Sequence, residues 1–135
     1  MEEPPQLEGA DKIVAWWGEW IDFHDFYLLN TPAPDCVNGE LRIHGWVTDW
    51  DATDGQGYFK RSRECVVTIG LSHIRSMKIS SEAIPAIIAE LKIEHVPSGW
   101  TVSWDSSYGV EGTIEAAAVR IDLQPGRPQT SEEAG

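Results

Sequence analysis

Residues 40–50, ELRIHGWVTDW, alternate apolar and polar side chains over almost their whole length. Leu41, Ile43, Gly45 and Val47 fall on one side of such a segment, and Arg42, His44, Trp46 and Thr48 fall on the other. Because successive side chains of an extended strand point to opposite faces, this period of two predicts a strand with one face on a core. The stretch therefore indicates a sheet protein.

Neighbouring segments continue this pattern and predict about seven strands in hairpin order. Residues 26–31 (FYLLNT) predict a short strand, which ends before the turn signal Asn38-Gly39. Residues 64–72 (ECVVTIGLS) are almost continuously apolar, which is typical of a strand covered on both faces. The remaining strands are predicted over 74–80, from the SEAIP turn (81–85) to Val96, over 100–104 (WTVSW) and from Val110 to Leu123.

The last predicted strand changes face part-way along its length. Ile114 and Ala116 share one phase of the alternation, whereas Val119 and Ile121 share the other. A slip of one residue turns every following side chain to the opposite face of a sheet. We therefore expect a β-bulge or a sharp bend near Ala116–Ala118.

A single helix is predicted before the strands. Asp11 can cap its start, and Ile13, Trp16, Trp17 and Trp20 follow at helical spacing. Gly18 costs the helix about 1 kcal/mol relative to alanine, but burial of so much indole surface favours it far more. We expect about three helical turns that lie across a sheet.

Together these elements predict one α+β domain over residues 10–124, with flexible tails at 1–9 and 125–135. The expected fold is an N-terminal helix packed on a mostly antiparallel sheet of about seven strands, curled as a roll or sandwich. A chain of 135 residues is long enough to bury one core without disulfides or a structural metal.

Negative charge dominates the chain, whose formal net charge at pH 7 is -12. Residues 1–54 hold twelve acids against Lys12 and Arg42, whereas residues 55–135 hold ten acids and eight bases. Such a field repels nucleic acid and anionic lipid and attracts basic partners. The charge predicts an acidic face and argues against binding to nucleic acid or a membrane, although solubility alone is an equally simple explanation.

Cellular location and cofactors are predicted from what the sequence lacks. No run of about 18 apolar residues occurs, and the N-terminus MEEPPQLEGADK has neither the basic nor the apolar region of a secretory signal. Cys36 and Cys65 stand outside any CxxC or metal-ligand spacing, so we expect reduced thiols in the cytoplasm. The acidic loop DWDATDGQG fails the spacing of a calcium-binding EF-hand, and no motif predicts a metal or another cofactor.

The triplet Phe23-His24-Asp25 holds the first candidate for chemistry. A catalytic histidine would need a third group in reach, such as Glu19 or Asp22, and no nucleophile motif accompanies it. Adjacent residues of a strand point to opposite faces, so we do not expect His24 and Asp25 to pair. The favoured interpretation is structural: both residues bond backbone groups at the corner where the helix meets the sheet.

Aromatic residues among acids are the second candidate. Trp46 and Trp50 lie close to Asp49, Asp51 and Asp54, and Glu19 with Asp22 near the end of the helix extends this acidic set. Indoles serve as anchors in protein interfaces, and carboxylates steer association with a basic partner. These residues predict a partner-binding surface. The alternative, in which both faces of the sheet are covered and Trp46 belongs to the core, has equal weight.

The order of these segments resembles the small family of immunity protein 50. The resemblance covers roughly residues 12–123 and rests on the aromatic helix, on FHD running into an apolar strand, on ELRIHGWV, on VVTIGLSHIRSMKI and on the late GVEGTIEAAAVRIDL. Members of that family are associated with bacterial polymorphic-toxin loci and contact-dependent competition. The resemblance brings no catalytic residues, because such proteins are assigned as inhibitors rather than enzymes.

The resemblance implies a cytoplasmic, non-enzymatic immunity protein that neutralises a cognate toxin by stoichiometric binding. The residues leave a second class of function open: a small hydrolase or ligand-binding roll that uses His24 and nearby carboxylates. A deep pocket in which His24 faces Asp22 or Glu19 would favour this alternative, and a flat, filled corner would not.

Overall fold

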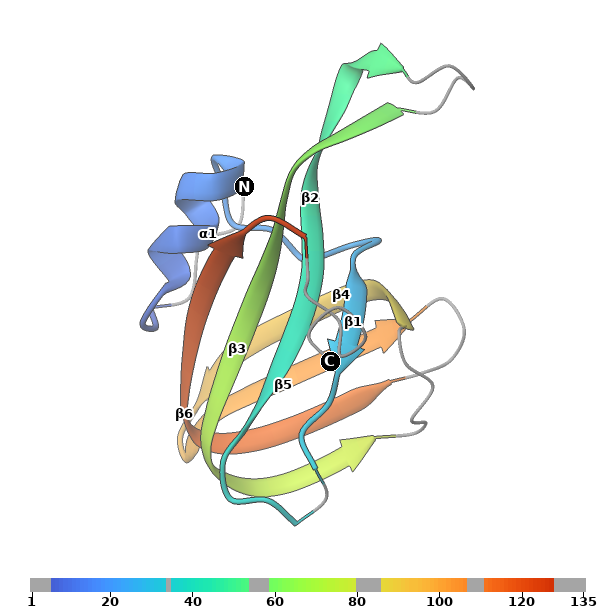
Figure 1. Ribbon diagram of the computed structural model, residues 1–135. Helices are drawn as coiled ribbons and strands as arrows, with labels where there is room; N and C mark the ends of the chain where they lie inside the picture. Colours follow the sequence, from blue (N-terminus) through green and yellow to red (C-terminus); the bar gives the residue numbers. More distant parts are fainter. Residues whose placement is uncertain (1–5, 34, 54–58, 80–85, 107–110, 128–135) are drawn as a thin grey trace.

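The computed structural model describes residues 6–33, 35–53, 59–79, 86–106 and 111–127, without the side chains of 49–53 and 59–61. Six strands form a closed barrel in the order β1-β2-β3-β6-β5-β4, in which all neighbours are antiparallel (Figure 1). In chain order the elements are α1 (Ala10–Trp17), β1 (Tyr27–Asn30), β2 (Gly39–Thr53), β3 (Phe59–Ile79), β4 (Ala86–Val96), β5 (Gly99–Ser106) and β6 (Gly112–Pro125). The broad α+β class is confirmed, but the prediction of a seven-stranded roll or sandwich is wrong.

The difference in strand number comes from β3. Residues 64–72 and 74–80 were expected to form two strands, yet β3 runs without interruption from Phe59 to Ile79. His73, whose φ is 53°, stands at the expected break, and the register with β6 shifts between Ile74 and Ser76. The loop before β2 holds this bend, because Asn38 Oδ1 accepts the His73 N–H at 3.1 Å. A strand that bends at an irregularity of this kind can continue around the barrel, so no turn separates the two predicted strands.

The predicted change of phase in the last strand is confirmed in β6. Gly112, Ile114 and Ala116 are buried in the first half, and Val119 and Ile121 are buried in the second. A register shift between β3 and β6 lies close to this change, between Ile74 and Ser76 of β3 and opposite Glu115–Ala116 of β6. The extra residue of this irregularity therefore belongs to β3 and not to β6. Figure 1 shows both β3 and β6 curving strongly along their length.

Helix α1 is shorter than predicted. It spans eight residues, and Gly18 ends it with a left-handed φ of 86°, a conformation that favours glycine. Trp20 therefore lies beyond the helix. The predicted cap at Asp11 is also wrong, because Gly9 occupies the N-cap without a side-chain hydrogen bond. Burial of the tryptophan side chains was expected to extend the helix beyond Gly18, but the helix ends at this glycine.

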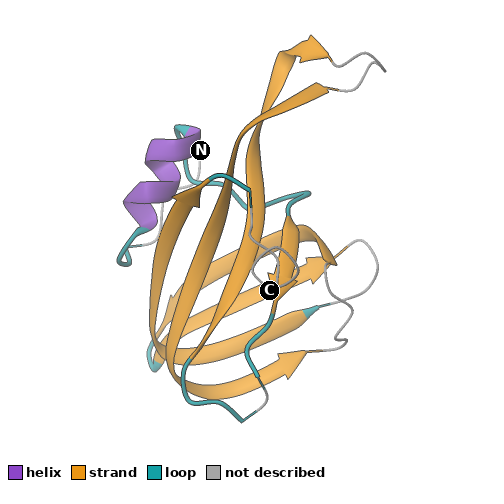
Figure 2. Ribbon diagram, viewed as in Figure 1, coloured by secondary structure: helices purple, strands orange, loops and turns teal. Residues whose placement is uncertain are grey.

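The barrel interior is filled with apolar side chains. Those at most 1% exposed include Leu28, Leu41, Ile43, Val67, Ile69, Ile88, Val102 and Ile114. Helix α1 lies outside the closed part of the barrel, against β6 and the upper part of β3 (Figure 2). Ile13 of this helix is fully buried, and Lys12 Nζ contacts Asp122 Oδ1 of β6 at 2.6 Å.

Segments at both edges of the predicted domain 10–124 also bond to it. Ile121 N donates to Glu8 O at 2.8 Å, and Gly126 N donates to Glu64 O at 2.7 Å. Beyond the barrel, β2 and β3 continue as a two-stranded arm (Figure 1). None of the helices in the described ranges has the length and apolar character needed to span a membrane.

Candidate functional site

The Phe23–Asp25 triplet forms a turn that leads into β1. Phe23 and Asp25 both have a left-handed φ, of 62° and 69°, and Phe23 is fully buried. The backbone of this turn is bound to β4, because Asp25 N donates to Ile88 O at 2.8 Å and Leu91 N donates to Asp22 O at 3.0 Å. The corner therefore continues the barrel wall beyond the start of the short strand β1.

The His24 ring bonds the backbone of β4. Its Nδ1 lies 2.7 Å from Ala89 O, so this nitrogen carries a proton and donates. Ala89 lies at a register shift between β4 and β5, where a bulge leaves backbone groups without a ladder partner. The Ala89 carbonyl raises the pKa of His24, and the carboxylates of Asp25 and Asp22 add to this effect. This bond is of the structural kind predicted for the corner.

The prediction that His24 and Asp25 do not pair is wrong. His24 Nε2 lies 3.4 Å from Asp25 Oδ2, and the two side chains are 61% and 68% exposed. They meet because the residues form a turn with a left-handed Asp25, so strand alternation does not apply. An ion pair this exposed contributes little to stability. His24, Glu19 and Asp22 do line one shallow depression of about 300 Å³, whose described lining contains no serine or cysteine.

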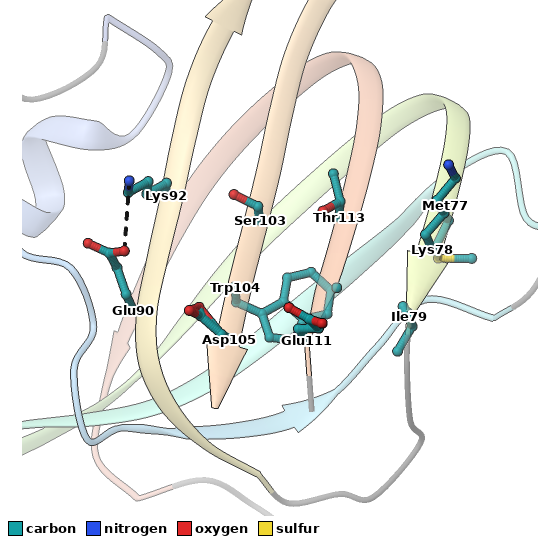
Figure 3. Close-up of a pocket in the computed structure, with 11 residues that line it drawn as sticks. Met77, Lys78, Ile79, Glu90, Lys92, Ser103, Trp104, Asp105, Glu111 and Thr113 are labelled. Atoms are coloured by element: carbon teal, nitrogen blue, oxygen red, sulfur yellow. Dashed lines mark ion pairs between the residues drawn. The ribbon is translucent and has the colours of Figure 1, made fainter. Parts of the chain in front are cut away.

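Charged side chains cover the outer surface of β4, β5 and β6. Five exposed acids, here called the acidic face, are Glu90, Glu94, Asp105, Glu111 and Glu115. The strand register places Glu90 opposite Asp105, and Glu115 opposite Thr101, which in turn pairs with Glu94. Lys92 Nζ lies 3.8 Å from Glu90 Oε1, and Figure 3 marks this ion pair with a dashed line. Like charges directly opposite on neighbouring strands are destabilising, so packing alone does not account for this arrangement.

A groove of about 730 Å³ lies at one end of the acidic face (Figure 3). Trp104 lines it and is 3% exposed, and its indole Nε1 is buried without a hydrogen-bond partner among the described residues. Gly112 makes room for this ring, because a Cβ there would lie 2.3 Å from a ring carbon of Trp104. A larger residue at 112 would force the indole to move.

A second groove, here called the edge groove, follows β4 from Glu90 to His95. It has a volume of about 700 Å³. Trp20 and Trp100 provide its aromatic lining, and the Trp100 ring packs against the His95 ring in a tilted arrangement, with centroids 4.8 Å apart. The charged residues that line it are Asp22, Glu90, Glu94 and Lys92. It joins the acidic face, because β4 contributes to both.

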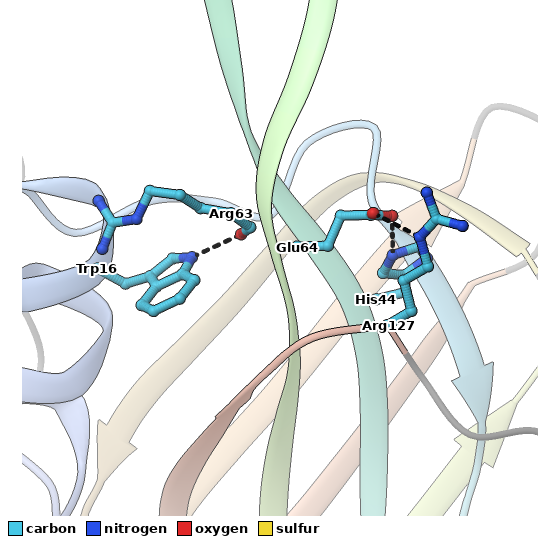
Figure 4. A network of polar contacts seen from close by, with 5 residues as sticks. All are labelled: Trp16, His44, Arg63, Glu64 and Arg127. Carbon is cyan, nitrogen blue, oxygen red and sulfur yellow. Dashed lines mark hydrogen bonds and ion pairs between the residues drawn. The ribbon is translucent and has the colours of Figure 1, made fainter.

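A polar network fixes the end of β6 to the barrel. Glu64 accepts from His44 Nε2 at 3.0 Å and from Arg127 Nε at 2.8 Å (Figure 4). The Arg127 guanidinium, and after it His44, lowers the pKa of Glu64. Nearby, Trp16 Nε1 donates to Arg63 O at 3.0 Å and the Arg63 guanidinium lies 4.2 Å from the Trp16 ring, which ties α1 to β3.

We expect Glu64→Gln to lower stability at neutral pH by about 1 kcal/mol, because charge-assisted hydrogen bonds are lost and Arg127 is largely exposed. The folded-state pKa of Glu64 lies below its ordinary 4.5, so its stabilisation is present above that value and is lost as pH falls through the folded pKa. Urea unfolding of both proteins between neutral and acidic pH measures this difference. A constant difference across that range would contradict the role assigned to Glu64.

Of the partner-binding residues expected from the sequence, Glu19, Asp22 and Trp46 line the shallow depression at the corner. Asp49, Trp50 and Asp51 belong to the arm, where their side chains lie outside the described residues, as does Asp54 altogether. Register pairs Asp49 with Lys60 and Thr48 with Arg61, so one acid of the arm, Asp49, stands opposite a base. Glu19 and Asp22 are exposed near the corner, and only Asp22 lines the edge groove.

Trp46 belongs to the core, which was the alternative to a place on the partner-binding surface. Its assignment to an exposed surface is wrong. Its side chain is 4% exposed. Phe26 and Tyr27 cover it, with ring centroids 4.9 and 5.4 Å from its own. Trp17 Nε1 donates to Trp46 O at 2.9 Å. The face of β2 opposite the barrel interior is therefore covered at this position.

Sequence reasoning missed the acidic face and the edge groove. The alternation of Glu90, Lys92 and Glu94 was visible as one polar side of a strand. What joins these residues to Asp105, Glu111 and Glu115 is the register of three strands, which a single sequence does not supply. Comparison with protein-family models, with curated proteins and with solved structures finds no match. The resemblance to immunity proteins therefore remains an expectation from the residues.

Proposed function

We propose that this protein acts by stoichiometric binding to a basic protein partner, as an immunity protein that neutralises a cognate bacterial toxin. The observation that carries the proposal is the acidic face, where four exposed carboxylates stand on three adjacent strands and a fifth, that of Glu111, directly precedes β6. Carboxylates gathered on one surface steer a basic partner and speed association. The resemblance of the sequence to immunity proteins supplies the class of partner.

Two further features support binding over catalysis. The barrel interior is packed with apolar side chains, so the grooves lie on the outside. Aromatic residues and carboxylates also occur together along β4, where Trp20 and Trp100 line the same groove as Asp22 and Glu94. Of these four residues, the sequence had suggested only Asp22 for a partner surface. Aromatic anchors bordered by charges are typical of protein interfaces.

Co-expression with a toxin encoded beside this protein's gene tests the function. We expect growth to be restored and a one-to-one complex to elute from a size-exclusion column. Absence of both growth rescue and complex would contradict the proposal.

The position of the interface is tested by two double variants that remove the same charge. We expect Asp105→Asn with Glu115→Gln, on the acidic face, to slow toxin association at least about threefold at low salt and to flatten its salt dependence. Asp49→Asn with Asp51→Asn, in the arm, changes net charge equally and serves as the matched control. A larger effect of the arm variant would place the interface there instead.

A further inference from the structure

Strand β4 has an edge that no described strand covers. It pairs with β1 only at Ala86 and Ile87, and the corner extends this pairing to Leu91, whose N–H donates to Asp22 O at 3.0 Å. In an antiparallel ladder, alternate residues direct their N–H and C=O groups to the same side. Ile93 and His95 therefore present their backbone groups to the side that Leu91 uses, and no described residue pairs with them there.

The edge groove lies along this free edge. Its lining runs through every β4 residue from Glu90 to His95, so an extended chain placed in it would lie beside the unpaired backbone. Exposed strand edges are templates for pairing with another chain. Addition of a partner strand gives affinity through main-chain hydrogen bonds and specificity through the side chains around it.

The charge of the groove selects the kind of chain. Asp22, Glu90 and Glu94 outnumber Lys92, which is already 3.8 Å from Glu90. Trp100 is part-buried at the far end and presents an aromatic ring, which attracts a lysine or arginine cation. Pairing with a second copy of β4 is disfavoured, because the acidic chains would repel each other.

We propose that the edge of β4 from Leu91 to His95 binds an extended, lysine- or arginine-bearing segment of a protein partner as an added strand. The inference rests on the proposed function for its choice of a basic protein partner, and it names the surface and the conformation of the bound segment. The edge groove supplies the main-chain contacts, and the acidic face beside it supplies the attraction.

The probe is a capped heptapeptide of alternating lysine and threonine, titrated to millimolar concentration into ¹⁵N-labelled full-length protein. We expect saturable shifts and slowed hydrogen exchange at the Ile93 and His95 amides, whereas the Lys92 and Glu94 amides, which face β5, stay protected throughout. The matched peptide of glutamate and threonine should cause neither change. The absence of saturable shifts, or equal shifts with both peptides, would overturn the proposal.

His95→Pro removes an edge N–H that faces away from β5, a position where a strand tolerates proline. We expect it to abolish the peptide response, while His95→Ala, which loses the same ring, retains it. Binding that survives in His95→Pro would overturn the proposal. If His95→Pro does not fold, Glu94→Lys provides the test: it should weaken the lysine peptide severalfold, and unchanged affinity would again overturn the proposal.

The peptide titration is independent of any toxin. A peptide response without growth rescue would retain the edge site and contradict the proposed function. Growth rescue without a peptide response would retain the function and place the toxin elsewhere on the molecule.

Discussion

Phe23→Ala is expected to lower the free energy of unfolding by about 3–5 kcal/mol, the usual cost of removing a buried aromatic ring. Phe23 is fully buried, and its ring makes edge contacts with Trp20 at 6.0 Å and with Phe26 at 6.4 Å. Its φ of 62° is unusual for a bulky residue, so the surrounding contacts must offset a strained backbone. Alanine keeps that strain and loses the contacts. Urea unfolding with a check of the m-value measures the loss.

His24→Ala is the control within the same triplet. The His24 ring is 61% exposed, so losing its bond to Ala89 O should cost only about 0.5–1.5 kcal/mol. A His24→Ala variant less stable than Phe23→Ala would contradict this division. A His24→Ala variant of wild-type stability that no longer protects cells would give the triplet a functional role.

Local patterns in the sequence predicted most of the strands. The alternation appears in the structure from Leu41 to Gly45, although Trp46 departs from it, and the phase change near Ala116–Ala118 appears in β6. Both patterns depend on which side chains face the core. The break between 64–72 and 74–80 was wrong for a physical reason. His73 adopts a left-handed φ and is held by Asn38, and that contact joins residues far apart in the chain. A bend held by a distant loop looks like a strand end in sequence.

Barrel closure and the candidate surfaces depend on strand register, which explains why they were not predicted. Closure requires Tyr27 and Leu28 to reach Ile87 and Ala86 across the whole sheet. The acidic face requires β4, β5 and β6 to align Glu90 with Asp105 and Thr101 with Glu115. The sequence instead predicted a partner surface that includes residues of the arm, because acids are concentrated in residues 1–54. In the structure, register sets Lys60 opposite Asp49 there.

Trp46→Ala is the second substitution with a large expected effect, about 3–5 kcal/mol of lost stability. Its ring packs against Phe26, Tyr27 and His44, at centroid distances of 4.9, 5.4 and 5.4 Å. A surface anchor would instead leave stability nearly unchanged and weaken binding. Thermal and urea unfolding distinguish these roles, and a Trp46→Ala variant as stable as the wild type would contradict the core assignment.

Trp100→Ala completes the comparison, because Trp100 is a part-buried tryptophan that lines the edge groove. We expect it to lose less stability than Trp46→Ala and to weaken binding of a basic partner by roughly tenfold, the effect of removing an anchor worth about 1.4 kcal/mol. Trp46→Ala, assayed at a temperature where it remains folded, should bind with wild-type affinity. Opposite effects on stability and binding would separate the indole that builds the barrel from the indole that meets the partner. If both variants lose binding in proportion to stability, Trp100 has no anchoring role.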